Sequence, residues 1–150
     1  MHSARTTVDR LAQEARAALQ NTLRDPEGQW LLAAHPGAAS EFALTSSGDG
    51  AASLASVRAD RIFHAGPEPH APGINSLWII DYKTATHSPA GLEDFLARQR
   101  AAYAPQLETY ACILAPARSK SRANVRLALY FPVLPRLIWW KASTPDEPTG

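Results

Sequence analysis

The chain has 150 residues, of which 45% are hydrophobic and 19% charged, a balance typical of one globular domain rather than a disordered or fibrous chain. Its 15 Lys and Arg against 14 Asp and Glu leave a formal net charge of +1, which excludes a protein that coats nucleic acid through a general excess of positive charge. The single cysteine, Cys112, excludes an internal disulfide framework and any zinc or iron–sulfur site built on several cysteines.

The N-terminal part begins with a predicted helix, Thr6–Leu23, which lacks Gly and Pro and repeats apolar residues at helical spacing. The sequence Asp25-Pro26-Glu27-Gly28 predicts a turn after it, and Trp30–Leu32 predicts a short buried run. No convincing capping residue precedes the helix, which leads us to expect a fragment truncated at its N-terminus. The chain has no apolar stretch that approaches a membrane span and no signal-peptide core, so we expect a soluble, cytoplasmic protein.

The rest of the chain predicts a central mixed sheet flanked by helices. Strands are expected at Ser40–Thr45, Ala52–His64, Leu77–Thr84, Val125–Val133 and Leu137–Trp140. Between the third and fourth strands lies a helical region, Leu92–Leu114, in which Pro105 is expected to start a second helix. The order of elements predicts one α/β domain over residues 1–140, followed by a flexible tail at 141–150.

Two acidic residues and a lysine fall at predicted strand ends. Because side chains alternate along a strand, Asp81 and Lys83 share one face, and a neighbouring strand carrying Asp60 would add a second carboxylate. Carboxylates beside a lysine can hold Mg²⁺ and assist phosphodiester hydrolysis. The alternative is a solvated ion pair, with Asp60 capping a turn. The apolar run Leu77–Ile80 weakens that alternative, because it places the charges at the end of a buried strand.

The later helical region carries a second pattern. Gln106 and Tyr110 are four residues apart and share a helix face. Tyr103, Leu107 and Tyr110 also lie on an apolar stripe, which core packing alone would explain. Gln106 does not fit an apolar face, however, and requires a polar partner there. A basic loop follows; its cations either contact DNA phosphates or are simply solvated. They are Arg118, Lys120 and Arg122.

Together these segments resemble the RecB-type branch of the PD-(D/E)XK nucleases, in the form found at the C-terminus of AddA-type, UvrD-like helicases. The resemblance is carried by Val57–Ile62, Trp78–Thr84 and Tyr103–Tyr110, with weaker likeness at Ser40–Leu44 and Leu129–Pro132. It implies a restriction-endonuclease-like core, in which a central mixed sheet is flanked by helices.

The resemblance also implies roles for particular residues. Asp60 and Asp81 would bind Mg²⁺, or Mn²⁺ in its place, with the Tyr82 backbone carbonyl as a further ligand. Lys83 would be the catalytic lysine, acting together with the two aspartates. Supporting roles beside the site fall to Gln106 and Tyr110, and a weaker one, structural in character, to Glu41.

The implied function is a metal-dependent deoxyribonuclease of the exonuclease V type, the nuclease module of an ATP-dependent helicase–nuclease in double-strand break repair and recombination. Its expected partners are single-stranded DNA, the helicase portion of the same polypeptide and an AddB-like second subunit, with no membrane. The alternative is a catalytically inactive nuclease-fold module that binds DNA or a partner subunit.

Two departures from the family pattern qualify this expectation. Active members carry a metal-ligating histidine on an early helix in a Gly-Thr-x-x-His setting, and Thr6–Leu23 has no histidine. Either that histidine lies upstream in a longer polypeptide, or this branch has lost the ligand and its activity. The chain also lacks a phosphate-binding Gly-x-x-x-x-Gly-Lys loop, so ATP dependence would belong to another part of the polypeptide. We therefore expect the isolated chain to cut DNA slowly or not at all.

Overall fold

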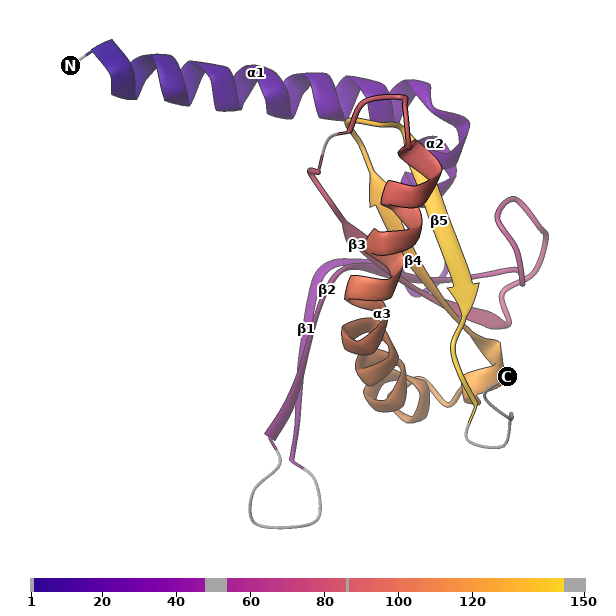
Figure 1. Ribbon diagram of the computed structural model, residues 1–150. Helices are drawn as coiled ribbons and strands as arrows, with labels where there is room; N and C mark the ends of the chain where they lie inside the picture. The colour runs from indigo at the N-terminus through magenta and orange to yellow at the C-terminus, as the bar shows by residue number, and fades with distance from the viewer. Residues whose placement is uncertain (1, 48–53, 86, 145–150) are drawn as a thin grey trace.

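The computed structural model describes residues 2–47, 54–85 and 87–144 (Figure 1). The elements are α1 (His2–Arg24), α2 (Pro26–Leu32), β1 (Ala39–Ser47), β2 (Leu54–Ala65), β3 (Ser76–Tyr82), α3 (Leu92–Ala117), a short 3₁₀ turn (Arg122–Asn124), β4 (Val125–Phe131) and β5 (Arg136–Lys141). The predicted α/β class is confirmed, and the arrangement is compatible with a restriction-endonuclease-like core.

Within the described residues, five strands form one mixed sheet in the order β1-β2-β3-β4-β5. Strands β3 and β4 run parallel, from the pair Leu77↔Val125 to the pair Tyr82↔Tyr130, while the other neighbours run antiparallel. A parallel pair needs a long crossover connection, and α3 supplies it. The central pair is covered on both faces, which explains why β4 is buried along its whole length.

The two faces of the sheet carry separate apolar clusters. Helix α3 covers one face, where Leu107 and Leu114 pack with the sheet residue Ile79. Leu31 of α2 packs on the other face against Trp78. Figure 1 shows α3 lying along the sheet and α1 extending away from it. Function must therefore be sought where charged side chains interrupt these two clusters.

The turn predicted at Asp25–Gly28 is wrong, because these residues join the start of α2. Pro26 occupies the first turn of that helix, where its missing N–H and fixed φ are tolerated. Gly28 is buried against α1, and a Cβ built on it would lie 2.2 Å from the Thr22 carbonyl oxygen. A glycine there therefore lets α2 pack closely on the end of α1, a contact that local sequence does not reveal.

The division of the second helical region at Pro105 is also wrong. Helix α3 continues through Pro105 to Ala117. Pro105 is exposed, whereas Leu107 and Tyr110 after it are buried in the cluster on the sheet. Burial of that face outweighs the backbone hydrogen bond that a proline removes from a helix interior.

We expect Pro105→Ala to raise the free energy of unfolding by about 1–3 kcal/mol, because it restores a helical N–H and removes the steric conflict with the preceding turn. Urea unfolding of both proteins measures the difference. A loss of stability would contradict this expectation and show that the buried face of α3 needs the bend that a proline imposes.

The strand boundaries also differ from the prediction. Strand β3 ends at Tyr82 and β4 at Phe131, each two residues earlier than expected. The start of the predicted flexible tail, 141–150, packs on the sheet instead. Ala142 is buried, and its N–H donates a hydrogen bond to the Val125 carbonyl at 3.0 Å. The rest of the predicted tail, residues 145–150, lies outside the described residues. None of the described helices combines the length and apolar character that crossing a bilayer requires.

Candidate active site

The pairing of β2 with β3 brings Asp60 and Asp81 together. Their register places Arg61 opposite Ile80, so the next pair along is Asp60 opposite Asp81. Asp60 also closes the end of the strand pair, because its Oδ2 accepts a hydrogen bond from the Tyr82 N–H at 2.7 Å. Asp60 thus lies inside β2, not at a strand end as the sequence suggested.

Lys83 completes the charged group from the end of β3. Its Nζ lies 2.8 Å from Asp81 Oδ2, and only 18% of the lysine side chain and 15% of the aspartate side chain are exposed. The ammonium also lies over the ring of Tyr103 on α3, 3.6 Å from the ring centroid. The predicted meeting of two carboxylates and one ammonium is therefore present. The contact with Tyr103 was missed, because its spacing places it on an apolar stripe.

Burial raises the pKa of Asp81 to about 6, and the hydrogen bond to Asp60 and the negative charge of Asp60 act in the same direction. The adjacent Lys83 ammonium opposes the shift and does not cancel it. Two carboxylates opposite one another on neighbouring strands repel. The group is therefore short of positive charge, which is the electrostatic condition that favours a bound cation.

The raised pKa predicts an unusual pH dependence. Because Asp81 titrates near 6 in the folded chain and near 3.8 when unperturbed, the folded state holds the proton more tightly. This contribution to stability is complete below 3.8 and is lost as the pH rises through 6. Between about pH 4 and pH 6 without divalent metal, the free energy of unfolding should therefore fall more steeply in the original chain than in Asp81→Asn, by up to about 1.4 kcal/mol per pH unit. Urea unfolding across that range tests this, and parallel slopes would contradict it.

The two residues of the predicted helix motif, Gln106 and Tyr110, form a hydrogen bond with each other. Gln106 is exposed, and its Nε2 donates to the Tyr110 hydroxyl at 2.9 Å. Tyr110 is itself 8% exposed and belongs to the cluster between α3 and the sheet. In the part of the chain that the structure describes, neither side chain bonds to Asp81 or Lys83. The polar partner that Gln106 requires is thus Tyr110, and the α3 residue that reaches the charged group is Tyr103.

Glu41 marks a change of face in β1. It has a positive φ of 53° and lies opposite Asp60, between the register pairs on either side of it. Ala39 and Phe42 both pack toward the α3 cluster, although simple alternation would place them on opposite faces. Glu41 and Asp60 also border one hollow of about 190 Å³. The weak supporting role expected for Glu41, structural in character, stays a prediction.

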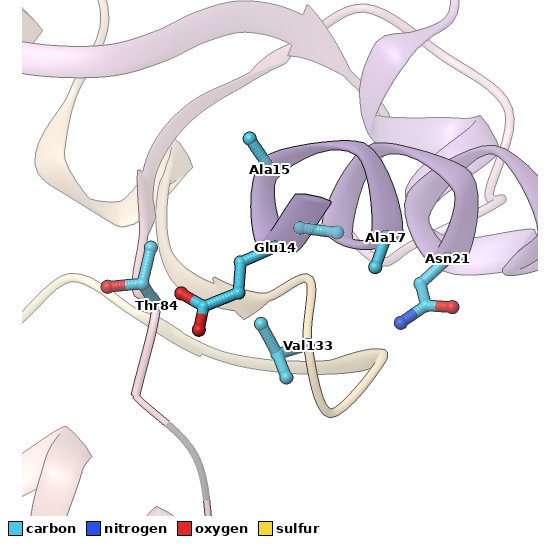
Figure 2. Close-up of a pocket in the computed structure, with 7 residues that line it drawn as sticks. Glu14, Ala15, Ala17, Asn21, Thr84 and Val133 are labelled. Carbon is cyan, nitrogen blue, oxygen red and sulfur yellow. The ribbon is translucent and has the colours of Figure 1, made fainter. Parts of the chain in front are cut away.

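A larger hollow of about 610 Å³ lies between α1 and the chain that follows β3. Figure 2 shows the Glu14 carboxylate directed toward Thr84 and Val133, across small residues of α1. Thr84, which lines this hollow, directly follows Lys83 in the chain. Helix α1 begins at His2, four residues before the predicted start, and Glu14 is the acidic residue that it presents here. The sequence pattern that could have identified Glu14 is its helical spacing, which places it on one face of α1 with Ala17, Ala18 and Asn21.

The basic loop after α3 divides into two kinds of residue. Arg122 pairs with Glu108, with Nη2 and Oε2 3.6 Å apart, and both side chains are largely covered. Arg118 instead approaches His64, a residue the sequence did not single out. Arg122 therefore has a partner within the fold, and its predicted contact with DNA loses support.

No protein-family model matches this chain, and no curated protein matches it in sequence. The resemblance to RecB-type nucleases therefore rests on the residue pattern alone and stays a prediction. Groups of three or more His, Cys, Asp or Glu side chains arranged to hold a metal do not occur among the described residues.

Proposed function

We propose that this chain is a metal-dependent DNA nuclease domain that hydrolyses phosphodiester bonds, working as the nuclease module of a cytoplasmic helicase–nuclease in DNA repair. The observation that supports it best is the β2–β3 register, which puts Asp60 and Asp81 side by side with Lys83. Single-stranded DNA, a helicase portion of the same polypeptide and an AddB-like subunit are the partners that this proposal includes.

The charged group fits a small divalent cation. Burial and the neighbouring Asp60 keep the pKa of Asp81 at about 6, so a cation would relieve the repulsion between the two carboxylates. Oxygen ligands with water in the remaining positions are what Mg²⁺ prefers. Asp60 Oδ2 already accepts the Tyr82 N–H and Asp81 Oδ2 pairs with Lys83, which leaves Oδ1 of each aspartate as a metal ligand. The Tyr82 carbonyl is the further ligand in this proposal.

A divalent cation supplies, when bound, polarisation of a phosphoryl oxygen and a lower pKa for a coordinated water. Asp60 and Asp81 hold and orient that cation. The Lys83 ammonium offsets the negative charge that develops on the phosphate oxygens. Tyr103 fixes the lysine from the opposite side through the contact of its ring with Nζ. The buried strand end keeps these charges strong by limiting their contact with water.

The second candidate is a nuclease-fold module without catalysis. It is favoured by the small donor set, since the described residues bring two carboxylates together and no third acid or histidine. In this alternative, the lysine–aspartate pair only neutralises charge at the end of β3, and the chain binds DNA or a partner subunit through other surfaces.

Calorimetric titration with Mn²⁺ separates these candidates. We expect one ion bound per chain, and we expect Asp81→Asn to abolish binding because it removes the central carboxylate. Asp94→Asn, which changes an exposed acid in the first turn of α3, is the matched control and should bind normally. Absence of binding by the original chain, or equal loss in the control, would refute the metal-dependent proposal.

A further inference from the structure

A cationic cluster lies on the fold away from the aspartates. It joins the end of α3 to β2 and the segment before β1, and its members are His64, Arg118 and Lys120. Arg118 Nη1 is 3.3 Å from His64 Nε2 and 3.4 Å from the Gly37 carbonyl oxygen. The guanidinium also lies over the ring of Phe42, with Cζ 5.5 Å from the ring centroid. These contacts fix the position of Arg118. None of the three partners carries a negative charge that would neutralise the guanidinium.

The cluster carries uncompensated positive charge. Within the described residues, no carboxylate lies within 4.0 Å of the cationic groups of Arg118 or Lys120. Burial lowers the pKa of His64, and the charges of Lys120 and Arg118 lower it further. The nearby Arg122 differs, because Glu108 neutralises it. Two neighbouring cations without a carboxylate partner attract an anion.

We propose that His64, Arg118 and Lys120 form a site for a backbone phosphate of single-stranded DNA. The proposal rests on the nuclease function above, because that function supplies a strand to be held. Arg118 offers a guanidinium fork, which suits phosphate oxygens, and Lys120 adds a point charge. Phe42 under the guanidinium keeps the fork in one orientation.

The position of the cluster suits a strand that also reaches the aspartates. His64 and Asp60 lie four residues apart on β2, about 13 Å along the strand. A few nucleotides of a single strand span that length. The cluster would therefore position the strand a few nucleotides from the bond to be cut, which makes its members positioning residues.

DNA binding in EDTA tests the site without any need for metal or cleavage. The probe is a fluorescent oligo-dT, and its affinity is measured by anisotropy as a function of salt. Each lost phosphate contact reduces the slope of log K against log salt by about 0.7 for a single strand. The double variant Arg118→Met with Lys120→Met removes the one proposed phosphate contact and should therefore lower the slope by about 0.7. Lys141→Met removes an exposed lysine from β5 at the opposite edge of the sheet and should leave the slope unchanged.

An unchanged slope in the double variant, or an equal fall in Lys141→Met, would overturn the proposal. Neither result bears on the nuclease function, which stands or falls with Mn²⁺ binding by Asp81. Conversely, loss of the metal site would leave the salt slope intact. The two proposals therefore fail separately.

A second measurement uses the unmodified chain and does not depend on the variants folding. The charged groups that act on His64 are Arg118 and Lys120, while its neighbours Gly37 and Leu77 are uncharged. A bound phosphate should raise the pKa of His64, followed by NMR of the ring. Oligo-dT should produce this shift at micromolar concentration, and inorganic phosphate only at much higher concentration. No shift with oligo-dT, or a shift with free phosphate alone, would refute the strand site.

Discussion

Lys83→Met is expected to reduce metal-dependent cleavage of a labelled single strand by about 100-fold or more. Electrostatic stabilisation by a fixed charge commonly contributes that much to phosphoryl and acyl transfer. Methionine keeps most of the length of the lysine stem, so the packing over Tyr103 is largely retained while the charge 2.8 Å from Asp81 is lost. The assay compares cleavage in Mn²⁺ and in EDTA by the chain joined to the helicase portion, because the isolated chain is expected to cut slowly or not at all.

Metal binding separates a catalytic role for Lys83 from a structural one. Removing the ammonium leaves the two carboxylates less neutralised, so Lys83→Met should bind Mn²⁺ at least as tightly as the original chain. Loss of both cleavage and binding would indicate that the lysine only maintains the site. If the chain joined to the helicase portion binds Mn²⁺ and still cuts nothing, the catalytic proposal is contradicted and the binding-module alternative is favoured.

Arg61→Met is expected to lower the free energy of unfolding by about 3 kcal/mol, because it removes three hydrogen bonds from a buried cation. Arg61 is 8% exposed. Its guanidinium donates to the Leu31 carbonyl at 2.7 Å, the Ala33 carbonyl at 2.9 Å and the Ser40 hydroxyl at 3.0 Å. One side chain thus ties the end of α2 to β1 and β2.

The matched control for Arg61 is on the same strand. Arg58 is exposed, and Arg58→Met makes the same chemical change without removing a buried network. Urea unfolding should show a change within about 0.5 kcal/mol for that variant. Similar losses in the two variants would show that charge or strand propensity, rather than the buried hydrogen bonds, sets the effect.

Helix and strand identity followed from the sequence wherever the pattern repeats over short distances. The run Leu77–Ile80 is buried as predicted, and Lys83, one residue beyond the end of β3, meets the Asp81 carboxylate as its spacing predicts. The stripe through Leu107 and Tyr110 also faces the core. These features depend on neighbours two to four residues apart, and side-chain geometry fixes which of them lie together.

The helix boundaries were predicted less well, because Pro and Gly allow more than one outcome. Pro105 remains inside α3, since burial of the helix face on the sheet offsets a local cost. Pro26 starts α2 instead of a turn, because Gly28 lets that helix approach α1 closely. In each case, a contact distant in sequence decides between two local structures.

The sequence by itself determined the five strands, the long helical region and the pairing of Asp81 with Lys83 on one strand face. Only the tertiary structure decided that Asp60 stands opposite Asp81, because a slip of one residue in the β2–β3 register would turn Asp60 to the other face of the sheet. It also decided that Lys83 meets Tyr103, and that Arg118 lies beside His64, 54 residues away. Those contacts depend on how the strands pair and where α3 crosses the sheet, and long-range packing sets both.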